Sequence, residues 1–130
     1  MIKRILIAHG AKEDQSEIDS VVKYVKKRIP GAEVATAREQ WFLRLASSGS
    51  ADQLAQDLGG GTNLDGSPLF HVVIFMRQYI GKRSALTAQA ALSRNRLVLF
   101  LDGLKVIPVR GVNCVDPDDW KAGWMLEETQ

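Results

Sequence analysis

Short apolar runs alternate with helically spaced apolar positions along most of the chain. Residues 5–8 form a continuous apolar run, which is typical of a strand buried on both faces of a parallel sheet. A helix-start signal, Asp14-x-x-Glu17, follows, and apolar residues at helical spacing continue until Pro30-Gly31. Residues 33–37 have the composition of a second short strand. The chain is therefore predicted to open with a β-α-β unit.

The pattern in the middle of the chain is less regular. Trp41, Phe42 and Leu45 favour one or two helical turns, and Ser50 can cap a further helix. Residues 59–68 are rich in glycine and turn formers, so we expect a flexible loop that could act as a mobile lid.

The most apolar strand of the sequence is predicted at residues 70–76. A loop over residues 77–83 follows it, and Ser84 can cap a helix that ends near Leu92. Residues 96–101 form the next predicted strand. Residues 70–101 are thus predicted to form a second β-α-β unit.

The last third of the chain is predicted to turn back on itself. Asp102-Gly103 is a typical two-residue hairpin turn, and Pro108 places the returning strand, residues 104–109, at an edge of the sheet. Residues 112–115 form a last short strand. The segment Asp116-Pro117-Asp118-Asp119 is a strong helix start, and we expect Trp120, Trp124 and Leu126 to pack that helix on the domain.

Strands that alternate with helices imply parallel strands and right-handed crossovers. We predict an α/β fold over residues 1–130: a single three-layer flavodoxin- or Rossmann-like domain with an open, mainly parallel sheet and an antiparallel edge hairpin. Ligands of such folds bind beyond the carboxyl ends of the strands. Two loops are expected there, residues 9–14 and residues 77–84.

Composition narrows the function classes. The chain is 45% hydrophobic and 25% charged, as in soluble globular proteins, and its net charge of +2 makes nucleic acid an unexpected partner. No secretory or membrane-spanning segment is apparent, so we expect a cytoplasmic protein without a membrane partner. The one cysteine, Cys114, lies in an apolar run and is predicted to be a buried structural thiol.

Basic residues gather in one supersecondary unit. Residues 67–101 contain no Asp or Glu but five Lys or Arg side chains. A helix N-terminus attracts anions through its free N–H groups and its dipole. The ligand-binding residues predicted from this loop and from the first one are Gly10, Arg77, Tyr79, Gly81, Lys82 and Ser84. Arg77 and Lys82 would neutralise a phosphate, Ser84 would donate to it, and Tyr79 would stack on a base; a solvated basic loop is the alternative.

His9 is the candidate catalytic residue, since it follows the first strand and could act as an acid or a base. A hydrogen-bonded structural histidine is the alternative. His71 is expected in the core or at the end of the sheet. The histidines form no ligand-spacing motif, so no metal is predicted, and the absence of Walker A and Gly-x-Gly-x-x-Gly motifs leaves no cofactor predicted.

The segment from Val72 to Leu101, with its Ile80-Gly81-Lys82 turn and its alanine-rich helix, resembles the nucleoside 2-deoxyribosyltransferase-like group. The resemblance covers about a third of the chain. It implies a flavodoxin-like domain, often a homo-oligomer and in some cases phage-encoded, with a helix-borne glutamate as nucleophile. This sequence has Thr87 or Gln89 where that glutamate would lie, which argues against the transferase reaction.

A second, local resemblance covers residues 5–34. The run before His9-Gly10, the following helix and the Pro30-Gly31 stop are similar to the start of the small sirohydrochlorin chelatases, in which a histidine after the first strand helps metal insertion. Ala11 replaces the serine usual in that family, and His71 lies in a different context from the family's second histidine. We interpret this likeness as a shared β-α-β pattern.

The sequence thus predicts binding of a nucleotide or a related phosphorylated small molecule, with action on its N-glycosidic or phosphate bond left open. If there is catalysis, a carboxylate such as Asp14, Glu39 or Asp102 would assist His9. The alternative is a non-catalytic protein, either a nucleotide sponge or sensor, or a protein-interaction module. An exposed tryptophan would favour the interaction module.

Overall fold

The structure is a computed structural model that describes residues 4–129. It is an α/β fold, consistent with a Rossmann-like fold, whose sheet has seven strands. Its elements are β1 (Arg4–Ala8), α1 (Gln15–Arg28), β2 (Glu33–Thr36), α2 (Ala37–Arg44), the 3-10 helix η1 (Leu45–Ser47), α3 (Ala51–Gly60), β3 (Val72–Phe75), β4 (Tyr79–Ile80), α4 (Lys82–Ser93), β5 (Leu97–Asp102), β6 (Lys105–Cys114) and β7 (Trp124–Glu128).

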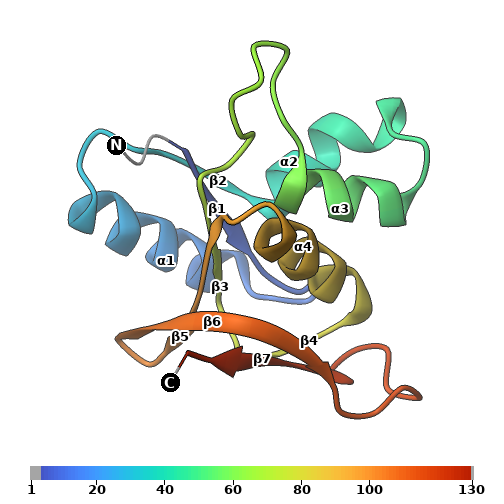
Figure 1. Cartoon of the computed structure of the whole chain (residues 1–130). Helices are drawn as coiled ribbons and strands as arrows, with labels where there is room; N and C mark the ends of the chain where they lie inside the picture. The colour runs from blue at the N-terminus through green and yellow to red at the C-terminus, as the bar shows by residue number, and fades with distance from the viewer. Residues whose placement is uncertain (1–3, 130) are drawn as a thin grey trace.

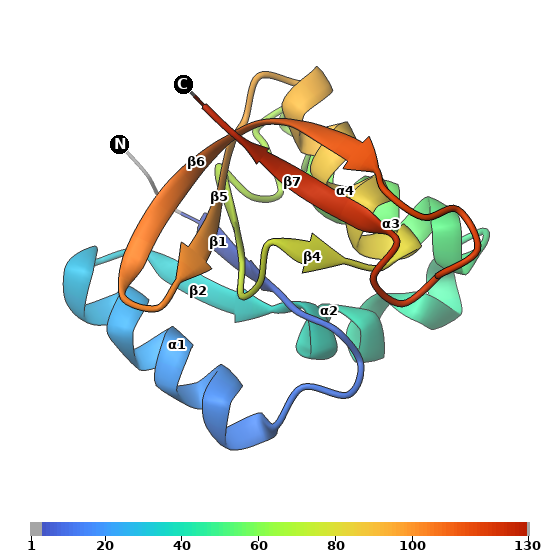
Figure 2. The same cartoon turned by 90° about the horizontal axis from the view of Figure 1, so that it is seen from below.

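The sheet is mixed and curled, in the order β2-β1-β3-β5-β6-β7-β4. The first four of these strands run parallel, and the other three join by antiparallel pairing. Figures 1 and 2 show β6, β7 and β4 bending away from the parallel half. A register irregularity between Val109 and Gly111 lies where β6 leaves β5, and such irregularities bend strands. The predicted open, mainly parallel sheet is therefore only half of the observed one.

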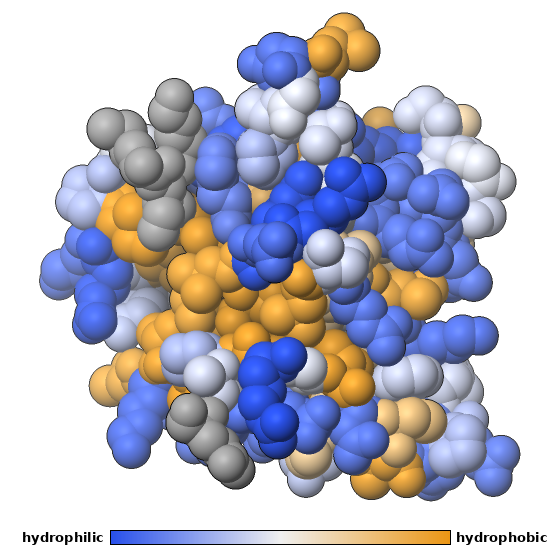
Figure 3. Space-filling model, viewed as in Figure 1, coloured by the Kyte–Doolittle hydropathy of each residue, from blue (hydrophilic) through white to orange (hydrophobic). Residues whose placement is uncertain are grey.

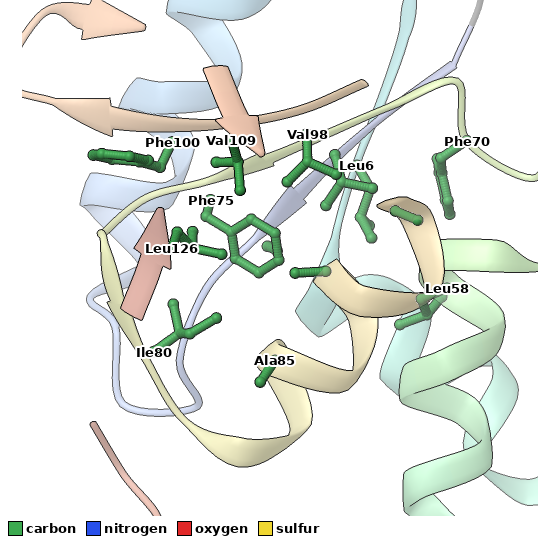
Figure 4. Packing of buried hydrophobic residues seen from close by; sticks show 14 of the residues in the cluster. Leu6, Leu58, Phe70, Phe75, Ile80, Ala85, Val98, Phe100, Val109 and Leu126 are labelled. Carbon is green, nitrogen blue, oxygen red and sulfur yellow. The ribbon is translucent and has the colours of Figure 1, made fainter. Parts of the chain in front are cut away.

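Alternating side chains of the parallel strands divide the core into two clusters. Ile5, Ile7 and Ile74 face α1, whereas Leu6, Val73 and Phe75 face α3 and α4. Figure 1 shows α1 on one side of these strands and the other two helices on the opposite side. Close to Phe75, side chains of β4, β7 and α4 (Ile80, Leu126 and Ala85) complete the second cluster (Figure 4). The curled part of the sheet thus closes the core around α4.

The hairpin between β5 and β6 is confirmed, but its two-residue turn is Gly103-Leu104, because Asp102 pairs with Lys105 as the last residue of β5. The edge position of the returning strand is wrong, because β6 also pairs with β7, starting at Val109 immediately after Pro108. The residue that we expected to mark an edge instead marks the point at which β6 gains a second partner.

The helix predicted from Asp116 onward is wrong. Residues 116–122 form turns in which the side chain of Asp116 accepts from the N–H of Asp118 and that of Asp119 accepts from the N–H of Lys121. The same short acidic side chains that cap helices also stabilise turns. Of the tryptophans expected to pack there, Trp120 is exposed and Trp124 is half-buried in β7.

The predicted mobile lid lies at the wrong end of the sheet to cover the candidate loops. Gly59 and Gly60 belong to α3, and the following loop is closed by a bridge between Thr62 and Pro68. That loop enters the amino end of β3, whereas the candidate loops leave the carboxyl ends of β1 and β3. A lid function at those loops is therefore excluded by the topology.

Two smaller expectations also change. Helix α4 begins at Lys82 with Gly81 as its N-cap, so Ser84 lies inside the first turn and does not cap it. Cys114 is exposed, because it ends β6 where the strand has left the core. Among the described residues, no helix is both long and apolar enough to cross a membrane.

Candidate functional site

The two candidate loops meet at the carboxyl ends of β1 and β3. These strands are neighbours, but the chain leaves β1 toward α1 on one face and leaves β3 toward α4 on the other. Neighbouring connections that diverge in this way open a crevice, the usual ligand position in α/β sheets. A cavity of about 230 Å³ lies there. A cavity thus lies where the two loop sequences predicted a ligand-binding site.

Most of the predicted site residues line this cavity: His9, Gly10, Arg77, Tyr79, Gly81 and Ser84. Lys82 does not line it and is exposed nearby in the first turn of α4. Among the lining residues that the sequence analysis did not assign to the site are Glu13 from the β1–α1 loop and Lys121 and Ala122 from the β6–β7 loop. His71 lies before the amino end of β3, far along the strand from His9.

The imidazole ring of His9 is held at both nitrogens. Its Nδ1 lies 2.9 Å from the backbone oxygen of Gly10, and its Nε2 accepts from the backbone N–H of Arg38 at 3.3 Å. These partners require a neutral ring with its proton on Nδ1. Burial lowers the pKa of His9, which also favours the neutral form. An acid–base role would require the ring to give up one of these hydrogen bonds.

Arg77 is paired with carboxylates from the first loop and from α1. Its Nη2 donates to Glu13 Oε2 at 3.1 Å and to Glu17 Oε2 at 3.4 Å, and its Nε donates to Glu13 Oε1. The hydrogen bond from Arg77 holds the pKa of Glu13 below its usual range, so this carboxylate is ionised at neutral pH. The charge of Arg77 is therefore largely neutralised within the protein.

Glu13 is the most informative residue that the sequence analysis missed. The carboxylates considered there do not line the cavity: Asp14 caps α1, Glu39 belongs to the capping box of α2, and Asp102 ends β5. The acidic residues that follow β1 were a sequence signal that could have indicated a carboxylate opposite the basic loop after β3. The charge count of residues 67–101 alone could not reveal it.

The N-terminus of α4 differs from those of the other described helices. Helices α1, α2 and α3 each begin with a capping side chain and carry an acidic residue in the first turn. Helix α4 has neither, and its first turn carries Lys82 and Arg83. Cations at the positive end of a helix dipole are unfavourable. Arg83 is paired with Asp52, so the cations left at this end are Lys82 and, from the β6–β7 loop, Lys121. Asp119 accepts from the backbone N–H groups of Lys121 and Ala122.

The positions that match the nucleophile of the deoxyribosyltransferase-like group do not supply one. Thr87 is buried, and its hydroxyl donates to the backbone oxygen of Ala55 at 2.7 Å. Gln89 is exposed and does not line the cavity. Among the described residues, no cluster of three or more His, Cys, Asp or Glu side chains could hold a metal ion.

A wider groove of about 620 Å³ lies between α3 and the C-terminal end of α4. It is lined by serine and glutamine side chains, Asp57, Arg44 and Arg94 among others, and it contains none of the predicted site residues. This groove lies at the amino ends of the strands, so it is separate from the cavity at the carboxyl ends of β1 and β3, here called the switch-point cavity.

Comparison with known proteins gives no relative: no family model, no curated protein and no solved structure matches this chain. The two resemblances seen in the sequence therefore stay predictions.

Proposed function

We propose that the protein binds a nucleotide or a related phosphorylated small molecule in the cavity at the carboxyl ends of β1 and β3. The observation that carries this proposal is the basic N-terminus of α4, which has no side-chain cap, at one end of that cavity. A phosphate there would accept from the N–H groups that follow Lys82 in the first turn and from the hydroxyl of Ser84, and would be balanced by Lys82 and Lys121. The parallel half of the sheet, with helices on both faces, supports a flavodoxin-like origin of the site.

The size of the cavity indicates which part of the ligand it encloses. A volume of about 230 Å³ is smaller than typical drug-sized pockets of about 300–1,000 Å³. We therefore place the sugar phosphate of the ligand inside the cavity. The base would lie at the mouth, where Tyr79 is 54% exposed and its ring could stack on the base.

The proposal is one of binding first, with chemistry as a second question. Both nitrogens of His9 already have partners, and α4 offers no carboxylate. A nucleotide sponge or sensor is therefore favoured over an enzyme that uses His9 as its acid or base. Mass spectrometry of the ligand after incubation separates the two, because a sponge returns its ligand unchanged.

A thermal-shift and calorimetric screen with nucleosides, nucleoside mono- and diphosphates, cyclic nucleotides and sugar phosphates tests the proposal. A ligand at a hundred times its Kd should stabilise the fold by about 2.7 kcal/mol, or roughly 5–10 °C. We expect this shift from phosphorylated compounds only, and a much weaker one for the double variant Lys82→Ala/Lys121→Ala. The control Lys26→Ala/Lys27→Ala removes two exposed lysines from α1, away from the cavity, and should bind as the parent does.

A protein-interaction role is the second candidate, and the exposure of apolar side chains favours it. Trp120 is 69% exposed beside the cavity, and Leu97, Leu104 and Val106 are exposed on the β5–β6 hairpin. Figure 3 shows apolar surface gathered over β5 and β6 with hydrophilic residues around it. Absence of any shift in the screen would reject the phosphate site and leave this role as the better proposal.

A further inference from the structure

The two ends of the switch-point cavity have opposite hydrogen-bonding character. The end at α4 presents donors, namely the hydroxyl of Ser84 and the N–H groups that follow Lys82 in the first turn, whereas the N–H of Lys82 itself donates to the backbone oxygen of Trp120. Lys121 lines this end too, with its ammonium 5.4 Å from the centroid of the Trp120 ring. The other end presents the carboxylate of Glu13, which only accepts when it is ionised, beside Arg77, whose Nε and Nη2 donate to Glu13 and Glu17. A ligand that spans the cavity must therefore carry an anion at one end and hydrogen-bond donors at the other.

Glu13 is positioned to accept hydrogen bonds from donors on the ligand. Its side chain is only 13% exposed, so water reaches it poorly. Arg77 donates one hydrogen bond to each carboxylate oxygen, which leaves an accepting lone pair on each. Two neighbouring acceptors of this kind match two neighbouring hydroxyl groups. Because the charge of Arg77 is balanced by Glu13 and Glu17, Arg77 attracts a phosphate to this end less than an unpaired arginine would.

We infer that Glu13, fixed by Arg77, makes the site selective for ligands with a vicinal diol, that is for ribose phosphates over deoxyribose phosphates. This inference rests on the proposed function and names the ligand class of the same cavity. The sugar lies between the two ends, its phosphate toward Ser84 and its 2′ and 3′ hydroxyls toward Glu13. A deoxy sugar leaves one lone pair of a partly buried carboxylate oxygen without the donor that the ribose hydroxyl supplies, which weakens its binding.

The test compares ligands before it compares variants. Calorimetry measures the Kd of the four ribonucleoside 5′-monophosphates, of their 2′-deoxy and 3′-deoxy counterparts and of ribose 5-phosphate. We expect each deoxy analogue to bind about tenfold or more weakly than its ribose parent, as for loss of a hydrogen bond to a charged group. This comparison uses the unaltered protein, so it does not depend on the folding of any variant.

Glu13→Gln then assigns the preference to this side chain, and Glu17→Gln is its matched control. Glu17 also contacts Arg77 but does not line the cavity. We expect Glu13→Gln to reduce the ribose preference to within about threefold, and Glu17→Gln to keep it, because only Glu13 faces the sugar.

The outcomes separate the two proposals. Equal binding of ribose and deoxyribose phosphates would overturn the diol selectivity and leave the phosphate site standing. A preference that survives Glu13→Gln would assign the selectivity to another residue and also overturn the inference. Failure of every phosphorylated compound to bind would reject the proposed function, and the selectivity with it.

Discussion

At the scale of single residues, His9 has a protonation state that its partners determine. Only the neutral ring can accept from the N–H of Arg38 while its Nδ1 faces the oxygen of Gly10. Burial lowers the pKa of the folded ring below the ordinary value of 6.5. The unfolded chain therefore binds a proton at a higher pH than the folded protein does. His9 therefore contributes its full stabilisation above the ordinary pKa of 6.5, and this contribution decreases as the pH falls from there through the lower pKa of the folded ring.

This linkage predicts a pH-dependent stability that one substitution removes. In urea unfolding, the free energy of unfolding of the parent should fall between about pH 7.5 and pH 5.5, and that of His9→Gln should change less across the same window. Glu13 and Asp14 titrate below their ordinary values of 4.5 and 3.8, so they act at lower pH and do not confuse the comparison. An unchanged slope in the variant would contradict a neutral, doubly bonded His9.

The sequence predicted the positions of His9 and Arg77 in the fold, but it did not predict the residues to which they hydrogen-bond. His9 and Arg77 follow strands that pair in parallel, so their nearness follows from the order of elements. The pairing of Arg77 with Glu13 joins residues 64 positions apart and depends on how two irregular loops turn. No periodic pattern records such a contact, and so the acid that faces the cavity was missed.

At the scale of elements, the contact between α3 and α4 depends on glycine at one position. A Cβ added to Gly59 would lie 1.9 Å from the backbone oxygen of Thr87 and 3.1 Å from the nitrogen of Ala91. Because backbone atoms cannot move aside cheaply, the helices would have to separate. We expect Gly59→Ala to lower the free energy of unfolding by about 1–3 kcal/mol in urea titrations.

Gly49→Ala is the matched control for this substitution. Gly49 has no atom within 4 Å of an added Cβ and lies in the connection before α3. It should be neutral or slightly stabilising, since alanine reduces the freedom of the unfolded chain. Equal effects of the two substitutions would argue against the close approach of α3 and α4.

Capping residues predicted where two helices begin, but the same kind of signal did not reliably predict that a helix forms. Asp14 and Ser50 cap α1 and α3 as the sequence indicated. The acidic cluster at residues 116–119 carried the same kind of signal but formed turns, because a helix-start signal describes only the first few residues. Whether a helix follows depends on what the next residues pack against, and Leu126 packs as part of a strand.

At the scale of the whole molecule, the curl of the sheet was beyond the reach of sequence patterns. Strand β4 has only two residues, too few to show a period, and it pairs with β7 across more than forty positions of the chain. That pairing folds the sheet back over α4 and brings the β6–β7 loop, with Lys121, to the cavity. The parallel half was predictable because each of its strands is a local apolar run.

Leu126 tests whether this closure stabilises the protein. Its side chain is fully buried, and its backbone N–H and oxygen bond to Gln78, in the segment that joins β3 to β4. Leu126→Ala should therefore lower the free energy of unfolding by about 2–5 kcal/mol. Leu104→Ala makes the same chemical change at a side chain that is 82% exposed and should stay within about 0.5 kcal/mol. Similar small losses at both positions would mean that β7 does not close the core, and the wall of the cavity that it supports would have to be placed differently.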